Sequence, residues 1–156
     1  MATKAHVAAL VRMATGVLFI AMGYGKLTGP FVHGGFAKSA EQLAREGWPF
    51  WGSLLHSVVL PRAEIFGWVV AVGEFAVGMG LLLGFLTRIA AVGGSLLLLS
   101  ILLGQSYVPG STWDHWITAG LTTKFALLLL LLISAVGYAA WGLDGVLRGP
   151  KRVRLR

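Results

Sequence analysis

The feature that most constrains the fold is a pair of long stretches that contain no charged residue. One runs from Ile89 to Trp113 and the other from Phe125 to Leu143. Stretches of this length are typical of helices that cross a membrane, because about 20 apolar residues span the hydrocarbon core. Composition agrees, since 56% of the residues are hydrophobic and only 12% are charged, which is unusual for a soluble domain. The sequence therefore predicts an all-α integral membrane protein.

Four spans are predicted, and together they make a single domain that covers residues 1–156. Their approximate limits are 6–28, 61–85, 87–107 and 117–141. The first span is too long for the apolar part of a cleaved signal peptide and no small-x-small site follows it, so we expect it to be retained. The expected fold is a four-helix bundle in the membrane.

The positions of the basic residues predict the orientation of these spans. Lysine and arginine in short connections are retained on the cytoplasmic side of the membrane. Basic residues precede the first span, separate the second from the third, and follow the fourth: Lys4, Arg88, Arg148, Lys151, Arg152, Arg154 and Arg156. We therefore expect a bacterial or archaeal plasma membrane protein with both termini in the cytoplasm. The basic tail is expected to contact anionic lipid and not nucleic acid.

The first outer connection, about residues 29–60, is too long to be a simple turn. Within it, Phe36–Arg45 has the composition of an amphipathic helix, and we expect this helix to lie along the membrane surface. The two outer connections also collect aromatic residues: Trp48, Phe50, Trp51, Trp113 and Trp116. These residues form either an interfacial belt or a cap over a site that opens at the outer leaflet, and both interpretations stay open.

Small or polar residues recur on one face of each of the first three spans, because they are spaced three or four residues apart. The residues are Arg12, Gly16, Phe19, Gly23 and Lys26 in the first span, Gly67, Ala71, Glu74, Gly78 and Leu81 in the second, and Gly93, Leu97, Ser100, Gly104 and Tyr107 in the third. Small residues let helices approach closely in lipid. We therefore expect these three faces to meet at a common axis.

Glu74 lies near the middle of the second span, where an ionised group is costly and normally faces the interior of the bundle. A rise of about 1.5 Å per residue, counted from the inner ends of the first two spans, puts Arg12 within reach of Glu74 and Lys26 too far away. Arg12 is therefore the predicted partner, with Lys124 as second choice. The pair either fixes the helix register or handles protons beside a reducible ring or along a transport path.

The residue types that are missing limit the chemistry of the chain. It contains no cysteine, which excludes a dithiol, a thiolate metal site and an iron–sulfur cluster. No pair of histidines faces each other within the spans, so haem is not expected, and no glycine pattern typical of a nucleotide-binding loop is present. The four histidines lie near span ends or in loops, as surface histidines do, so no metal site is predicted.

Short motifs occur in a defined order from about Leu10 to Leu147. They are Arg12, Gly16 and Phe19, then Gly23–Leu27 (GYGKL), Val72–Glu74 with Gly78, Leu81–Arg88 (LLLGFLTR) and Gly142–Asp144 (GLD). In this order and spacing they resemble the DoxX/DoxD family. Members of that family are four-helix membrane proteins, and some are membrane subunits of thiosulfate:quinone oxidoreductase or of other membrane-associated oxidoreductase complexes. The resemblance implies a quinone-linked redox role, with thiosulfate as the donor.

That role suggests functions for particular residues. Glu74 and Arg12 would be catalytic, Lys26 would line the interior site with them, and Arg88 would lie near its cytoplasmic mouth. The quinone would also contact the tryptophans near the outer mouth, which are Trp48, Trp51, Trp113 and Trp116. The expected partner is a second redox subunit or another copy of the chain, and a partner subunit or the bound quinone would carry the electrons.

Two other classes of function stay open. One is a non-enzymatic membrane scaffold or assembly factor that docks a soluble redox enzyme. The other is a small transporter with a water-accessible path beside Glu74. Two of the named residues also have plainer interpretations, Arg88 as a topology anchor and Asp144 as an ion-pair partner of Arg148 four residues later.

Overall fold

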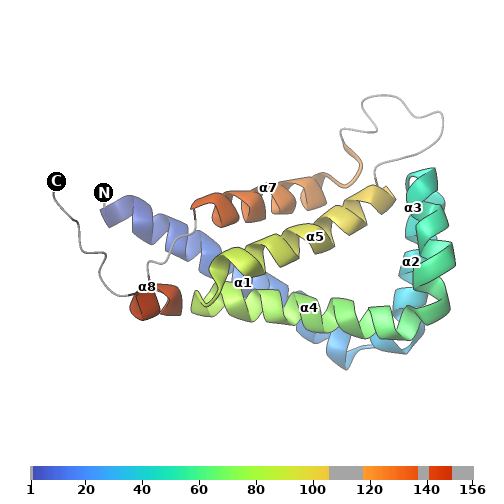
Figure 1. The fold of residues 1–156 in the computed structure, drawn as a ribbon, viewed down its shortest axis with the longest axis horizontal. Coiled ribbons are helices and arrows are strands. Elements are labelled where there is room, and N and C mark those ends of the chain that lie inside the picture. The colour runs from blue at the N-terminus through green and yellow to red at the C-terminus, as the bar shows by residue number, and fades with distance from the viewer. Residues whose placement is uncertain (1, 106–117, 137–140, 149–156) are drawn as a thin grey trace.

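The computed structural model describes residues 2–105, 118–136 and 141–148 (Figure 1). Every regular element within these residues is helical, and the all-α prediction is confirmed for them. The helices are α1 (Ala2–Thr28), α2 (Phe36–Glu46), α3 (Pro49–Leu54), α4 (Ala63–Leu83), α5 (Thr87–Gln105), α7 (Leu121–Val136) and α8 (Leu143–Arg148). Three single-turn segments join the earlier helices: Phe31–Gly35, Leu55–Val59 and Leu60–Arg62.

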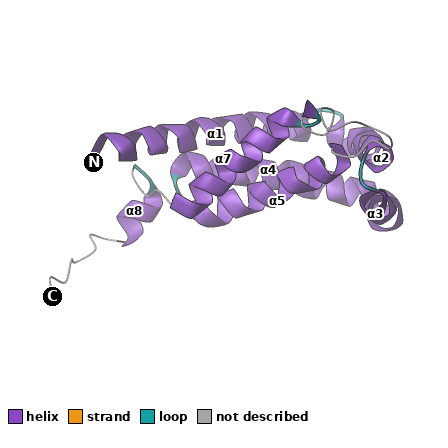
Figure 2. Cartoon of the chain, turned by 90° about the horizontal axis from the view of Figure 1, so that it is seen from above, coloured by secondary structure: helices purple, strands orange, loops and turns teal. Residues whose placement is uncertain are grey.

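Helices α1, α4, α5 and α7 run along the length of the molecule (Figures 1 and 2). Helix α1 packs against α4, α4 packs against α5, and α5 packs against α7. Three helical stretches, Ala5–Thr28, Pro49–Leu83 and Thr87–Gln105, are long and apolar enough to cross a membrane, and Leu121–Ala135 is a shorter apolar helix. Such stretches indicate a multi-pass membrane protein. Four crossings arranged as a bundle in the bilayer stay a prediction.

Glycines bring α1 and α4 into backbone contact. A Cβ atom placed on Gly16 would lie 2.6 Å from the amide nitrogen of Leu82, and one placed on Gly23 would lie 2.5 Å from that of Phe75. Contacts this short leave no room for a side chain, which is the close approach that small residues permit in lipid. They confirm that the small faces predicted for the first two spans meet, and they set the register of α1 against α4.

Helices α4 and α5 are closest beside the turn that joins them. This turn places Gly84 at φ +63°, a left-handed conformation that favours glycine at the end of a helix. A Cβ atom on Gly80 would lie 2.9 Å from the Cβ of Ala90, whereas one on Gly73 would lie 3.6 Å from Cδ1 of Leu97. The two helices therefore separate with distance from the turn, as Figure 1 shows.

Helices α2 and α3 cross the ends of the long helices, on the side away from that turn (Figures 1 and 2). The link between them contacts α5, because a Cβ atom on Gly47 would lie 2.8 Å from the Cα of Gly104, and the Trp48 amide donates to the Leu103 carbonyl at 3.1 Å. Helix α2 confirms the helix predicted at residues 36–45, whereas its position on a membrane surface stays a prediction. Helix α3 was not predicted.

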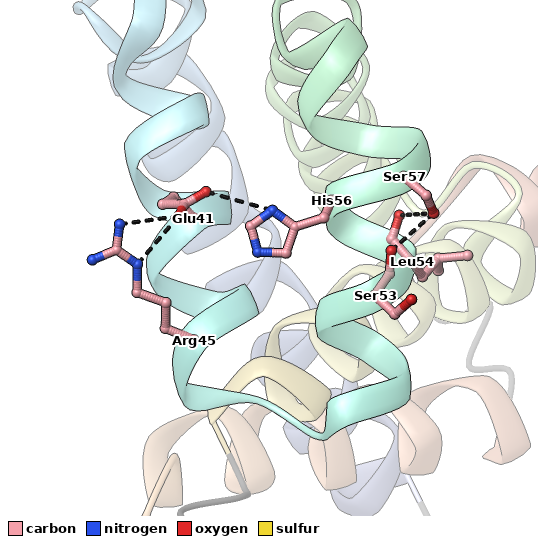
Figure 3. Close-up of polar contacts among 6 residues, drawn as sticks. All are labelled: Glu41, Arg45, Ser53, Leu54, His56 and Ser57. Carbon is pink, nitrogen blue, oxygen red and sulfur yellow. Dashed lines mark hydrogen bonds and ion pairs between the residues drawn. The ribbon is translucent and has the colours of Figure 1, made fainter.

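An exposed group of charges joins α2 to the segment that follows α3 (Figure 3). Oε1 of Glu41 accepts from Nη2 of Arg45, one turn later, at 3.0 Å. Oε2 of Glu41 lies 3.9 Å from Nδ1 of His56. Ion pairs on a surface contribute little to stability, because water screens them. This group therefore differs in kind from the buried charges of the long helices.

Candidate functional site

Two side chains from α1 and α4 form a buried ion pair. Nζ of Lys26 donates to both carboxylate oxygens of Glu74 at 2.5 Å. The side chain of Glu74 is 2% exposed and that of Lys26 is 22% exposed. Nζ of Lys26 also lies 5.2 Å from the centre of the Phe31 ring, within the range of cation–π attraction. Either charge alone would be costly at this depth, so each offsets the burial of the other.

The predicted pairing of Glu74 with Arg12 is wrong, and the register of α1 against α4 explains why. Gly23 lies opposite Phe75, so Lys26 is within one helical turn of the level of Glu74. Arg12 precedes Lys26 by about four turns, or about 21 Å along the helix. The gap between Arg12 and Glu74 is therefore too long for a side chain to bridge.

Counting the rise per residue from the inner end of each span could not predict this register, because that count assumes that the two inner ends lie at the same level. Helix α1 begins at Ala2, earlier than the predicted start of the span, and glycine contacts then decide which turns of α1 and α4 lie together. The second predicted partner, Lys124, belongs to α7, which packs against α5.

Arg12 is buried at the opposite end of the molecule from the ion pair, where α8 meets the turn between α4 and α5. Its Nη2 donates to the Trp141 carbonyl at 3.2 Å. Its guanidinium fills the space beside Gly84 and Gly142, so that a Cβ atom on either glycine would collide with it. The carboxylate of Asp144 interacts electrostatically with Arg12. Arg12 thus helps to fasten α8 to the rest of the fold.

Asp144 caps the first turn of α5. Its Oδ1 accepts from the Leu86 amide and its Oδ2 from the Thr87 amide, both at 2.9 Å. Its own amide donates to the Gly84 carbonyl at 2.8 Å. A carboxylate suits the positive end of a helix and satisfies amides that have no partner within it. The GLD motif therefore has a structural role, because it holds α8 against the turn before α5. The side chain of Arg148 lies outside the part of the chain that is described.

Asp144→Ala is expected to lower the free energy of unfolding by about 1–2 kcal/mol, because two amides at the start of α5 lose their acceptor. Asp144→Asn, which keeps one acceptor oxygen, is expected to lose less. Thermal unfolding in mild detergent, followed by circular dichroism, measures both changes. If Arg148→Ala destabilises the protein as much as Asp144→Ala, an ion pair and not the helix cap stabilises this end.

The buried ion pair lines a cavity of about 550 Å³ between α2, α4 and α5. A cavity of this volume is in the range of ligand pockets. Its charged lining residues are Lys26, Glu46 and Glu74. Most of the wall is apolar, and aromatic side chains come from several segments: Phe31, Phe36, Trp51 and Phe66. Residues of α2, α4 and α5 line the cavity, and in Figure 1 α2 crosses the end toward which α4 and α5 diverge.

Trp51 adds a polar group to this apolar wall. Its indole Nε1 is buried and has no hydrogen-bond partner among the described residues. A buried donor without a partner costs free energy, so an indole N–H beside a cavity is suited to donate to an oxygen of a ligand. Trp51, Lys26 and Glu74 are the predicted site residues that the structure brings together in one cavity.

The other predicted site residues lie elsewhere. Arg88 is exposed in the first turn of α5, at the same end of the molecule as Arg12. Trp48 is half-buried in the link between α2 and α3 and is not among the residues that line the cavity. Trp113 and Trp116 lie outside the described residues.

Helix α2 supplies the part of the cavity that sequence reasoning missed. Its residues Phe36, Ala40 and Leu43 form one helical face and all line the cavity. An amphipathic pattern identifies an apolar face but not what covers it, and the prediction assigned this face to a membrane surface. The close approach of Gly47 to Gly104 holds α2 against α5. Small residues at both positions are the signal that could have indicated a contact within the protein.

Comparison with known proteins identifies one related group. A family model described as DoxX matches residues 7–104, a range that contains the ion pair and nearly all of α1 to α5. No curated protein and no solved structure matches the chain.

Proposed function

The chain belongs to the DoxX family, and we propose that it is the membrane subunit of a quinone-linked oxidoreductase, with the quinone ring bound beside Lys26 and Glu74. The observation that carries this proposal is a buried ion pair in the wall of a mostly apolar cavity of about 550 Å³. Apolar cavities with a few convergent polar groups are the usual form of cofactor sites.

The residues around the cavity suit a quinone. Flat aromatic side chains favour contact with another flat ring, and the lining provides Phe31, Phe36 and Phe66. A quinone also presents carbonyl oxygens, which need hydrogen-bond donors. Lys26 is one donor, and the indole of Trp51, whose Nε1 has no partner among the described residues, is a second.

A bound quinone would supply the redox chemistry, because it takes up two electrons and two protons. Amino acid side chains alone do not provide this chemistry. Glu74 would hold a proton on its carboxylate and pass it to a ring oxygen, as a general acid within hydrogen-bond reach does. Lys26 would balance the charge of Glu74 after the proton has left. Arg12 lies at the opposite end of the molecule, so we assign it to α8 and not to this chemistry.

The electrons must come from a partner, because a chain without cysteine has no thiol to carry them. Thiosulfate is the donor that the family resemblance suggests. Two thiosulfate ions that join through a sulfur–sulfur bond release two electrons, which is the number that a quinone accepts. A second redox subunit would perform that oxidation, and another copy of this chain is the alternative partner.

We also propose that the protein lies in a bacterial or archaeal plasma membrane with both termini in the cytoplasm. The start of α1 and helix α8 are at the same end of the molecule (Figure 2). Arg88 is exposed at that end, as expected for a basic residue retained in the cytoplasm. The cavity then lies toward the outer leaflet.

Retention of quinone by the purified protein tests this function. Wild type in mild detergent is expected to yield stoichiometric quinone on solvent extraction and mass spectrometry. Glu74→Gln is expected to lose it, because Lys26 without its carboxylate partner can turn its ammonium group away from the ring, while the size of the side chain at position 74 is kept. Glu64→Gln is the matched control, since Glu64 is exposed on the same helix and does not line this cavity.

Folded wild type that carries no quinone would contradict the proposal. If a soluble redox enzyme then co-purifies equally with wild type and with Glu74→Gln, the scaffold function takes its place. If the protein instead moves protons or solutes across liposome membranes in a way that depends on Glu74, the transporter function does.

A further inference from the structure

Part of the cavity wall beside Lys26 and Glu74 is open to the surroundings of α4 and α5. Val69 in α4 and Leu96 in α5 both line the cavity, yet they are 59% and 63% exposed. Both lie in stretches that are long and apolar enough to cross a membrane. Side chains that line a cavity and also face outward mark an opening, which here lies between α4 and α5.

The packing of α4 against α5 accounts for this opening. The helices touch at Gly80 and Ala90 and make only ordinary van der Waals contact at Gly73, so they diverge toward α2 (Figure 1). Around Val69 and Leu96 the cavity lining is aliphatic, as it also includes Val70 and Leu97, whereas Ser100 and Gln105 line it farther along α5. Uncharged aliphatic groups at membrane depth accept hydrocarbon chains, whereas an ion would lose its hydration there without compensation.

The remaining lining of the cavity includes polar side chains. Ser39, Gln42 and Glu46 of α2 line it and are exposed at the end of the molecule. Together with Lys26 and Glu74 they place polar groups on the side of α1, α2 and the buried face of α4. The cavity therefore has buried polar groups at Lys26 and Glu74, polar groups of α2 at the end of the molecule, and an apolar opening between α4 and α5.

We infer that this cavity is loaded from the bilayer by a ligand with a polar ring and one long apolar tail. The ring passes between α4 and α5 and lies beside Lys26 and Glu74, and the tail stays in the gap between Val69 and Leu96. This inference rests on the proposed function for the ring, and it goes further by assigning the route and the place of the tail. A water-soluble ring without a tail makes no use of the gap.

Filling the gap with large side chains tests the route. The variant Val69→Trp/Leu96→Trp and the wild type are titrated in detergent micelles with two probes that share one ring, decylubiquinone and the same ring without its tail. A second pair, menaquinone with four isoprene units and menadione, covers the other common ring type. In the gap variant the Kd of the tailed probe is expected to rise by about tenfold or more, and that of the tail-free probe by less than about twofold.

Val72→Trp/Leu99→Trp is the matched control. Val72 and Leu99 are exposed on the same two helices and are not among the residues that line the cavity. This control is expected to bind both probes as the wild type does. Each variant must first show the thermal unfolding transition of the wild type, so that a loss of binding does not arise from misfolding.

Each alternative result has a definite meaning. Equal affinity of wild type and gap variant for the tailed probe would overturn the bilayer route and leave the proposed function intact. Equal loss of both probes from the folded gap variant would also overturn it, because the new side chains would then act on the ring and not on the tail. Wild type that binds neither ring type would refute the proposed function itself, and the inference with it.

Discussion

Lys26→Met is expected to lower the free energy of unfolding by about 3–5 kcal/mol, because it leaves a buried carboxylate without its cation. Glu74 is 2% exposed, so water cannot replace the lost partner. Glu74→Gln is expected to cost less, since Lys26 is 22% exposed and its long side chain can turn its ammonium group toward polar surroundings. Unfolding in mild detergent, by heat or by titration with a denaturing detergent, measures both variants.

The double variant Lys26→Met/Glu74→Met tests whether Lys26 and Glu74 stabilise the protein as a coupled ion pair or as two independent residues. It is expected to recover most of the stability that the single changes lose, because no buried charge remains. The exposed pair in α2 is the control, and Glu41→Gln, which removes the negative charge that pairs with Arg45, should cost less than about 0.5 kcal/mol. Losses that simply add in the double variant would contradict a coupled buried pair.

Gly23→Ala is expected to destabilise the protein by about 3 kcal/mol, the upper part of the range for overpacked cores. The added methyl group would lie 2.5 Å from the backbone nitrogen of Phe75. The backbone of α4 cannot turn aside as a flexible side chain can, so α1 and α4 must move apart. Because Lys26 follows in the next turn of α1, the variant is also expected to retain less quinone. Unfolding in mild detergent and solvent extraction measure the two effects.

Gly25→Ala is the matched control in the same helix. A Cβ atom on Gly25 would meet nothing within 4 Å. Alanine is the better helix former, and this change is expected to stabilise the protein by about 0.5–1 kcal/mol or to leave its stability unchanged. If Gly23→Ala and Gly25→Ala behave alike, the backbone contact between α1 and α4 does not limit the packing.

The faces of the first two spans could be predicted from the sequence because helical periodicity alone determines them. Residues three and four apart share one side of a helix, and the small residues Gly16, Gly23 and Gly78 on those sides are the ones in the contact between α1 and α4. The same periodicity predicted α2 as a helix. It did not predict that α2 closes a cavity, because an apolar face binds lipid or protein equally well.

The carboxylate cap on α5 could not be predicted from a pattern of neighbouring residues either, because such a pattern does not show which distant segments meet. Asp144 accepts from amides 57 and 58 residues away in the chain, whereas sequence spacing suggested Arg148 as its partner. Capping patterns are recognisable when donor and acceptor are neighbours in sequence. A cap supplied by another helix becomes visible only when the fold brings the two together.

The sequence by itself determined the helical character of the described residues, the apolar stretches long enough to cross a membrane, which residues share a face, and which family the chain resembles. Each of these properties depends on the apolar character and spacing of residues within a segment. Only the tertiary structure decided that Glu74 pairs with Lys26 and that Arg12 belongs to the opposite end. Helical periodicity leaves the sliding of one helix along another undetermined, and here backbone contacts at a few glycines, distant in sequence from their partners, set that position.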